Sequence, residues 1–250
     1  MKAIILAAGK GTRLNGVDLK PKCLFEVGGR TLLDWQVSAL TEAQINEIVL
    51  VLGFEAERIR RHCPPNTSFV TNARFEETSS LYSLWLAREH LLDGFVVLNC
   101  DVLFHPELLA KLISSPFDDA LLVDFANRQL GDEEMKVKVS DGLVVDIRKD
   151  MEAAEADGEN VGIVKFSAAG AKRLIEAMDS IISRGQERDW APRAFREFAT
   201  RFPLHAISTD DYPWIEIDFP EDYRKAKDEI YPRILLNHKE AQNTETLETV

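Results

Sequence analysis

The sequence has few cysteines and no long apolar run. Its three cysteines, Cys23, Cys63 and Cys100, are widely spaced along 250 residues. This spacing excludes a disulfide framework or a zinc knuckle and predicts reduced thiols. No apolar run approaches the roughly 20 residues that span a bilayer, and the N-terminus lacks the pattern of a signal peptide. We therefore expect a soluble, cytoplasmic protein without a membrane partner.

Positive charge is also scarce. The chain has 30 Lys and Arg residues against 42 Asp and Glu, a formal net charge of −12, which argues against nucleic-acid binding. The segment from Gly9 to Lys22 is an exception. It has a local surplus of about +3, because four basic residues accompany one acid, Asp18. The basic residues are Lys10, Arg13, Lys20 and Lys22. This segment predicts a site for a small polyanion.

The first expected strand leads directly into a glycine loop. Residues 3–7 form an apolar run typical of a strand buried on both faces of a parallel sheet. The small side chains of residues 8–13 let the backbone approach a ligand and point its N–H groups at oxygen anions. Leu14 stands where a dinucleotide fingerprint needs glycine, and Walker A spacing is absent. The loop predicts phosphate or nucleotide binding, with a plain turn carrying solvated lysines as the alternative.

Strands and helices alternate along most of the chain, which predicts an α/β fold. We expect a Rossmann-like, mixed, mainly parallel sheet flanked by helices. A hairpin around Asp141-Gly142 predicts a small antiparallel excursion. The expected strands are 3–7, 24–27, 48–52, 68–70, 95–99, 120–125, 135–140, 143–147, 158–166, 204–207 and 212–219. The expected helices are 31–40, 55–62, 81–91, 106–113, 168–182, 190–199 and 220–230. Residues 1–235 are expected to form a single domain, and 236–250 a disordered tail.

Several segments together carry a family resemblance. Residues 6–14, LAAGKGTRL, followed by Pro21-Lys22, resemble the signature of nucleotidyltransferases that join a nucleoside triphosphate to a sugar phosphate or an alcohol phosphate. Five later segments are similar to the phosphocholine cytidylyltransferase branch of that family. They are 72–84, 98–101, 133–137, 158–163 and 213–222. The resemblance covers the chain to about Ile234 and implies the nucleotide-diphospho-sugar transferase fold.

The resemblance also implies roles for individual residues. Lys22 and Arg13 would be catalytic, and Lys22 would contact the triphosphate at the reacting phosphorus. We expect Lys22 to be an exposed loop lysine that contributes little to stability. The residues implied in nucleotide binding are Leu6, Ala8, Gly9, Gly11, Thr12, Arg13, Lys22, Thr78, Ser79, Ser80 and Asp101. Lys149, Glu159 and Gly162 match positions that contact the acceptor, with a simple turn residue as the alternative for Glu159.

Two aspartates are the candidate metal ligands. Asp101 follows the strand 95–99 and so is expected at the same sheet edge as the glycine loop. Asp218 ends the strand 212–219, whose alternation places it on one face with Trp214 and Glu216. Two carboxylates with triphosphate oxygens and waters suit Mg²⁺, and acids at the matching positions hold the metal in the resembled family. The alternatives are a solvated strand end for Asp101 and a helix cap for Asp218.

The acceptor is expected to carry an amine. An alkylammonium group would need aromatic faces and carboxylates, which Trp190, Tyr212, Trp214 and Glu216 could supply, although the aromatic residues could equally be ordinary core or rim side chains. We therefore expect transfer of CMP from CTP to an acceptor of the phosphocholine or 2-aminoethylphosphonate type. A sugar-1-phosphate or inositol-phosphate nucleotidyltransferase and a nucleotide-binding regulator without turnover are the alternatives. The choice between CTP and UTP, and a homodimer, stay open.

Overall fold

The computed structural model of the chain describes residues 1–14, 20–65, 67–127 and 130–236. Asp18 and residues 237–250 of the expected tail lie outside the described residues, whereas residue 236, the first of that tail, is helical. Among the described residues, no helix is both long and apolar enough to cross a membrane.

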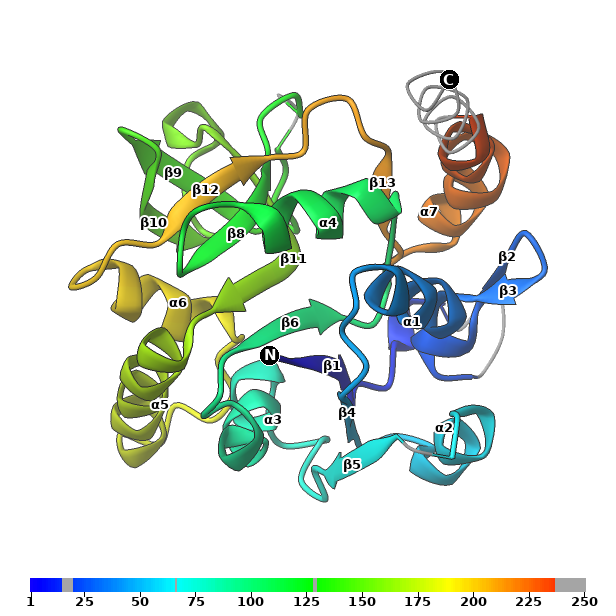
Figure 1. Ribbon diagram of the computed structural model, residues 1–250, viewed down its shortest axis with the longest axis horizontal. Helices are drawn as coiled ribbons and strands as arrows, with labels where there is room; N and C mark the ends of the chain where they lie inside the picture. Colours follow the sequence, from blue (N-terminus) through cyan, green and yellow to red (C-terminus); the bar gives the residue numbers. More distant parts are fainter. Residues whose placement is uncertain (15–19, 66, 128–129, 237–250) are drawn as a thin grey trace, which may run out of the picture.

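Nine strands from residue 2 to residue 208 share one mixed sheet. In Figure 1 the sheet runs from β5 at the bottom to β9 and β10 at the upper left. In spatial order they are β5 (Ser68–Thr71), β4 (Ile48–Leu52), β1 (Lys2–Ala7), β6 (Phe95–Asn99), β11 (Gly158–Phe166), β8 (Ala120–Asp124), β12 (His205–Ser208), β10 (Leu143–Arg148) and β9 (Lys136–Ser140). All of them except β11 and β10 run in the same direction. The sheet is therefore mixed and mainly parallel, as predicted, and β9 and β10 form the expected hairpin.

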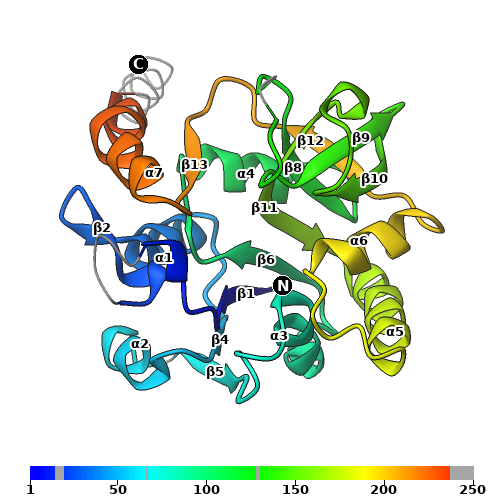
Figure 2. The ribbon, with the colours of Figure 1, turned by 180° about the vertical axis from the view of Figure 1, so that it is seen from behind.

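Helices cover both faces of this sheet (Figure 1, and from behind in Figure 2). One face packs against α3 (Ser80–Leu86), α5 (Ala168–Ser183) and α6 (Pro192–Ala199). The other packs against α1 (Leu32–Glu42), α2 (Ala56–His62) and α4 (Pro106–Ser114). Residues of β1 alternate between the two cores, with Ile4 in the first and Ile5 in the second, because successive strand side chains point to opposite faces. The unbroken apolar run in the sequence reflects this double burial.

Some predicted element boundaries were wrong. The expected strand 24–27 is a 3-10 turn, Lys22–Leu24, followed by a short hairpin of β2 (Glu26–Val27) and β3 (Arg30–Thr31). The strand expected at 212–219 is only β13 (Trp214–Glu216), which pairs with β7 (Val102–Phe104) outside the main sheet.

Helix boundaries also differ from their predictions, as three examples show. The helix expected at 81–91 is α3 followed by a 3-10 turn, Arg88–His90, and α6 begins at Pro192. Proline suits that first helical position because its missing N–H has no partner there. The last helix is longer than expected: α7 (Pro220–Lys225) continues through a π-helical turn, Ala226–Ile230, to residue 236. Its apolar residues Ile230 and Ile234 are buried in a third core cluster, which sustains the extra turns.

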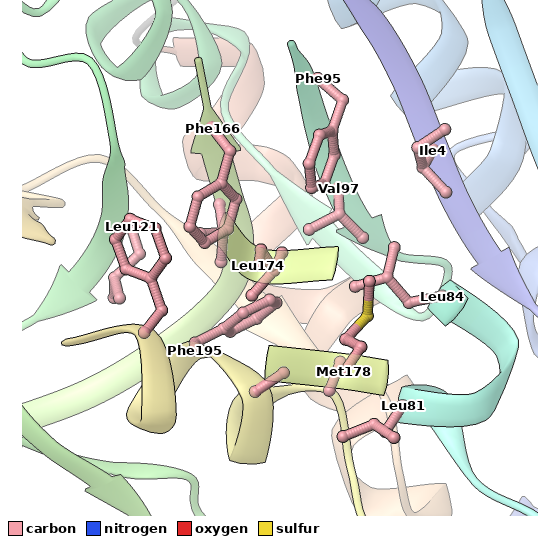
Figure 3. Packing of buried hydrophobic residues seen from close by; sticks show 14 of the residues in the cluster. Ile4, Leu81, Leu84, Phe95, Val97, Leu121, Phe166, Leu174, Met178 and Phe195 are labelled. Atoms are coloured by element: carbon pink, nitrogen blue, oxygen red, sulfur yellow. The ribbon is translucent and has the colours of Figure 1, made fainter. Parts of the chain in front are cut away.

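Aromatic rings fill the centre of the first core (Figure 3). The Phe166 ring of β11 lies 5.4 Å from Phe95 of β6, 5.5 Å from Phe195 and 5.1 Å from Phe198, measured between ring centroids. Phe166 and Phe95 are fully buried. This cluster holds β6 against β11 and α6, and β6 is the strand that delivers Asp101.

Replacing the central ring should destabilise the protein strongly. We expect Phe166→Ala to lower the free energy of unfolding by about 3–5 kcal/mol, because it removes a buried ring and leaves a cavity. Urea unfolding followed by circular dichroism measures this. The control is Leu92→Ala, since Leu92 is 41% exposed and its loss should change stability by less than about 0.5 kcal/mol. Equal effects of the two changes would contradict the assigned core.

Candidate active site

A cleft of about 360 Å³ opens at the carboxyl ends of β1 and β6. Its lining comes from segments that are far apart in the sequence: the glycine loop, the turn before α3, the turn after β6 and the strand β13. The lining residues are Leu6, Ala8, Gly9, Gly11, Thr12, Arg13, Lys22, Asn72, Phe75, Thr78, Ser79, Ser80, Ser83, Asn99, Cys100, Asp101, Glu133, Met135, Lys149, Asn160, Trp190, Pro192, Glu216 and Asp218. Open α/β sheets bind ligands at this edge.

Backbone geometry explains two glycines of this region. Gly11 has a φ of +60°, and a Cβ there would lie 2.7 Å from the Cγ of Lys22. Only glycine combines this backbone conformation with room for the lysine side chain to pass. A Cβ on Gly53, after β4, would lie 2.6 Å from the carbonyl oxygen of Ala8. The glycine loop is thereby packed closely against the neighbouring strand end.

Residues 78–80 are held by the segment before α6. Ser79 N donates to Glu187 O at 3.0 Å, and Ala191 N donates to the Ser80 hydroxyl at 2.8 Å. Asn72 is almost fully buried, and its side chain donates to the hydroxyls of Thr78 and Ser83, at 3.0 Å in each case. These bonds fix the turn that faces the glycine loop across the cleft.

Oppositely charged side chains meet on the floor of the cleft. The Lys22 ammonium donates to Asp101 at 3.0 Å and also to Asp218. Arg13 contacts Asp218 at 3.1 Å and Glu133 at 2.8 Å, and Glu133 also contacts Lys149 at 3.3 Å. The Lys22 side chain is only 13% exposed. The expectation of an exposed loop lysine was therefore wrong, because the adjoining carboxylates hold this side chain inside the cleft.

The ionisation of the floor residues follows from this pairing. Burial by itself would lower the pKa of Lys22, but Asp101 and Asp218 outweigh it and raise that pKa above its ordinary value. Burial would likewise raise the pKa of Asp218, but the charges of Lys22 and Arg13 hold it below its usual range. The pKa of Glu216 is raised by burial and by the neighbouring Asp101 and Asp218. The floor thus carries paired charges and one carboxyl that burial keeps from ionising readily.

The capping alternative for Asp218 is excluded by its neighbours. The carboxylate of Asp222 accepts hydrogen bonds from Asp218 N at 3.1 Å and from Phe219 N at 2.8 Å, which caps α7. The carboxylate of Asp218 is directed at Lys22 and Arg13 instead. It is a floor residue of the cleft, not the cap of the helix.

Three carboxylates here could hold a metal ion. One oxygen each of Asp101, Glu216 and Asp218 lie within 4.8 Å of one another. An all-oxygen set of this kind suits a hard divalent cation. Lys22 already supplies a positive charge between two of these side chains, so the cluster accepts a cation in this position. The donor set therefore fits the predicted metal ion.

A second hollow, of about 480 Å³, adjoins the cleft and shares Glu133, Glu216 and Asp218 with it. Its lining is strongly acidic, with Lys225 and Arg233 at its outer side. The acidic lining residues are Asp124, Glu133, Glu134, Glu159, Asp210, Asp211, Glu216, Asp218, Asp222 and Glu229. Tyr212, Trp214 and Phe219 add aromatic surface. Carboxylates and ring faces together are what a cationic group needs in order to leave water.

Two residues of the second hollow have informative contacts. Trp214 Nε1 donates to Asp124 at 2.9 Å, so the ring has a fixed orientation. Glu159 is 8% exposed, and Asn127 donates to its carboxylate at 2.9 Å. Burial raises the pKa of Glu159 to about 7, with Glu134 and Asp124 adding to the rise and Asn127 opposing it. Glu159 therefore changes charge near neutral pH.

The structure brings most of the predicted site residues together. Every residue predicted to bind the nucleotide lines the cleft, as do Lys149, Trp190, Glu216 and Asp218. Glu159, Tyr212 and Trp214 line the second hollow. Gly162 lines neither: it lies within β11, where a Cβ would meet the Asn99 side chain at 2.7 Å.

The predicted aromatic cage is divided between the two hollows. Trp190 lies in the first cleft, where the Lys149 ammonium is 4.9 Å from its ring centroid, and not beside Tyr212 and Trp214. Trp190 lies between Glu187 and Ala191, whose backbone groups hold Ser79 and Ser80, and this places it at the first cleft.

Several lining residues were missed by the sequence reasoning. Asn72 and Asn99 are amides at strand ends in the first cleft, Asn160 is an amide within β11 that lines the same cleft, and Asp124 and Glu133 border the second hollow. Asp124 ends the expected strand 120–125, so the same strand-end argument that selected Asp101 could have found it. Glu133 lies in a loop without periodicity and gave no such signal.

Comparison with known proteins identifies the family. Residues 3–191 match the MobA-like NTP transferase domain, and the chain belongs to this family of nucleotidyltransferases. The chain is 26% identical over 248 residues to the CTP:phosphoglutamine cytidylyltransferase of Campylobacter jejuni, covering 89% of this chain and 97% of the relative. It is 27% identical over 231 residues to the choline-phosphate cytidylyltransferase of Streptococcus pneumoniae, with 91% and 97% covered. These findings confirm the predicted family and branch.

The fold is also that of solved nucleotidyltransferases. The inositol-1-phosphate CTP transferase from T. maritima superposes with a TM-score of 0.78 at 21% identity, covering 93% of this chain and 94% of that one. The expected nucleotide-diphospho-sugar transferase fold is confirmed.

Removal of the central ammonium should expose the repulsion among the carboxylates. We expect Lys22→Met to lower the melting temperature in the absence of metal by about 3–8 °C, because it leaves buried charges unpaired. Adding Mg²⁺ should raise the melting temperature of Lys22→Met more than that of the wild type, since a divalent cation replaces the lost charge. Differential scanning fluorimetry with and without Mg²⁺ measures both. Lys20→Met is the matched control, and equal Mg²⁺ shifts in the two variants would disprove the assignment.

Proposed function

We propose that the protein is a cytidylyltransferase that transfers CMP from CTP to a small phosphate or phosphonate carrying an amine, with release of pyrophosphate. The observation that carries this proposal is the contact between a cleft that contains three basic side chains and a hollow whose lining is mainly acidic. The first, around Lys22 and Arg13, presents cations to a triphosphate. The second, which shares Glu216 and Asp218 with it, is lined by carboxylates and aromatic rings. The two relatives that act on choline phosphate and phosphoglutamine support the same branch.

In the proposed reaction, an acceptor oxygen attacks the α-phosphorus in line. A bond forms between this oxygen and the α-phosphorus, the bond from the α-phosphorus to the bridging oxygen breaks, and pyrophosphate leaves with the electron pair. The acceptor oxygen is already anionic, so no general base is needed. Catalysis then depends on positioning and on neutralising charge.

The residues of the floor have distinct parts in this scheme. Arg13 and Lys22 offset the charge of the triphosphate, and Lys149 binds the acceptor phosphate. Asp101 and Asp218, with Glu216 beside them, would hold Mg²⁺, which when bound supplies positive charge to the triphosphate oxygens. Glu133 now pairs with both Arg13 and Lys149. Bound phosphate groups would take over its contacts with these two cations.

The amine end of the acceptor is assigned to the second hollow. A cation there gains attraction from the surrounding carboxylates and from the faces of Tyr212 and Trp214. An inositol phosphate is the second candidate, because carboxylates also accept hydrogen bonds from polyol hydroxyls and an inositol-1-phosphate CTP transferase shares the fold. An amine acceptor has a positive charge at this end, whereas the polyol end of an inositol phosphate is neutral. The experiments therefore compare acceptors that differ in this charge.

The first experiment is a substrate panel. Pyrophosphate release is measured with Mg²⁺ and CTP against phosphocholine, 2-aminoethylphosphonate, inositol 1-phosphate and glucose 1-phosphate, and again with UTP and ATP. We expect turnover with CTP and an amine acceptor, because only a cation is attracted by the acidic lining. Turnover limited to the polyol or sugar phosphates would retain the reaction type and exclude the amine acceptor.

The pH dependence of acceptor binding tests Glu159. With a pKa of about 7, this carboxyl is about nine-tenths ionised at pH 8 and about one-tenth at pH 6. The Michaelis constant for an amine acceptor should therefore rise as the pH falls from 8 to 6, because the protonated form loses its attraction for the cation. Glu159→Gln should show a raised Michaelis constant at pH 8 and a weaker pH dependence. The acceptor phosphate titrates equally in assays of the wild type and of Glu159→Gln, so it does not cause a difference between them. Identical pH profiles of the Michaelis constant for the two proteins would show that Glu159 has no part in acceptor binding.

A further inference from the structure

One polar side chain is fully buried in the middle of helix α1. Gln36 is 0% exposed, and it occupies the stripe of α1 that the sequence presents as apolar, near Leu33 and Leu40. A buried amide destabilises a protein unless its hydrogen bonds are made. Its partners therefore show what this residue does.

The partners of Gln36 are two backbone carbonyl groups beside Asp101. Its Nε2 donates to Asn99 O at 2.8 Å and to Val102 O at 2.9 Å. These carbonyls lie immediately before and after the two-residue turn Cys100-Asp101 at the end of β6. From the other direction, Ile217 N donates to Asp101 O at 3.0 Å. The turn that carries Asp101 is thus held on one side by α1 and on the other by the segment that carries Asp218.

The oxygen of the Gln36 amide lowers the stability of the protein. Gln36 Oε1 is buried and has no hydrogen-bond partner among the described residues. An unpaired buried acceptor lowers stability, and an apolar side chain of the same length would avoid that cost. It would, however, remove one hydrogen bond from each of the carbonyls of Asn99 and Val102 and leave the turn without its support from α1. The hydrogen bonds that the Gln36 amide makes are therefore those of its two donors, and both go to the carbonyls that flank this turn.

Helix α1 also contacts the segment that carries Lys22. It packs against β7, directly after the Asp101 turn, and against the 3-10 turn Lys22–Leu24. In the ribbon views α1 lies next to the end of β6 (Figures 1 and 2). A single helix thus sets the separation between Lys22 and Asp101, whose charged atoms are 3.0 Å apart.

We propose that Gln36 is a positioning residue for Asp101: its two donors hold the Cys100-Asp101 turn where the carboxylate meets a divalent cation and the triphosphate. The inference rests on the proposed nucleotidyl transfer for its catalytic consequence, while its consequence for metal binding stands without it. Gln36 itself touches neither the substrates nor the reacting atoms. Its loss acts through the position of Asp101.

The test replaces the amide by an apolar side chain of similar length. We expect Gln36→Met to lower kcat by about 10–100-fold, because a displacement of about 1 Å at a reacting centre has effects of this size. The Michaelis constant for the acceptor should stay within about twofold of the wild type. Affinity for Mn²⁺, measured by calorimetry on the substrate-free protein, should fall by about fivefold or more.

The matched control is Leu40→Ala on the same helix. Leu40 is also 0% exposed and packs in the core cluster between α1 and the sheet. Its truncation therefore lowers the melting temperature through packing alone. Assayed well below its melting temperature, Leu40→Ala should retain the kcat and the Mn²⁺ affinity of the wild type. This separates a loss of position from a loss of stability.

The outcomes distinguish the two proposals. Wild-type kcat and Mn²⁺ affinity in Gln36→Met would overturn the role of Gln36. A wild-type protein that binds Mn²⁺ but turns over none of the substrates would overturn the proposed function, and the Mn²⁺ comparison would still decide the role of Gln36. A wild-type protein that does neither would overturn both. If Gln36→Met does not fold, Gln36→Asn, whose shorter amide loses reach to one or both carbonyls, takes its place with the same outcomes.

Discussion

An ammonium group held among carboxylates is the interaction on which the site depends. Asp101, Glu216 and Asp218 come from two distant segments, and their oxygens lie within 4.8 Å of one another. Like charges this close repel strongly where water is partly excluded. Lys22 offsets that repulsion without a bound ion, which lets the floor of the cleft form before any ligand arrives. In the proposed reaction, a divalent cation would be held by the same carboxylates.

The strands and the helix around this cluster fix the distances between its charged side chains. β6 ends in the Asp101 turn, β13 brings Glu216 and leads to Asp218, and the pairing of β13 with β7 ties the two segments together. Helix α1 contacts the segments of both Lys22 and Asp101. None of β6, β7, β13 and α1 belongs to the glycine loop, which is the clearest motif in the sequence. The geometry of the cleft therefore depends on these elements as much as on the glycine loop.

Two adjoining hollows that differ in charge make up the site. Arg13, Lys22 and Lys149 line the cleft beside four acidic side chains, whereas ten acidic side chains outnumber two basic ones in the second hollow. In the proposed reaction, an acceptor would place its anionic end near Lys149 and its cationic end in the second hollow. Arg13, Lys22 and Lys149 thus bring positive charge to one place in a chain whose formal net charge is −12.

The sequence by itself determined most of the strands, the glycine loop and the acidic residues Asp101 and Asp218 of the cleft. Continuous apolar runs such as residues 48–52 predict buried parallel strands, and Asp101 at a strand end predicts a place at the binding edge. What the sequence could not provide were contacts between distant segments: the division of Trp190 from Trp214, the burial of Lys22, the short β13–β7 pair and the acidic second hollow. Gln36 shows the limit most clearly. Its position in an apolar stripe predicts simple packing, and only the tertiary structure reveals that its amide faces the Asp101 turn. Periodicity records which face of an element is buried, but the partner on that face is chosen by how the whole chain folds.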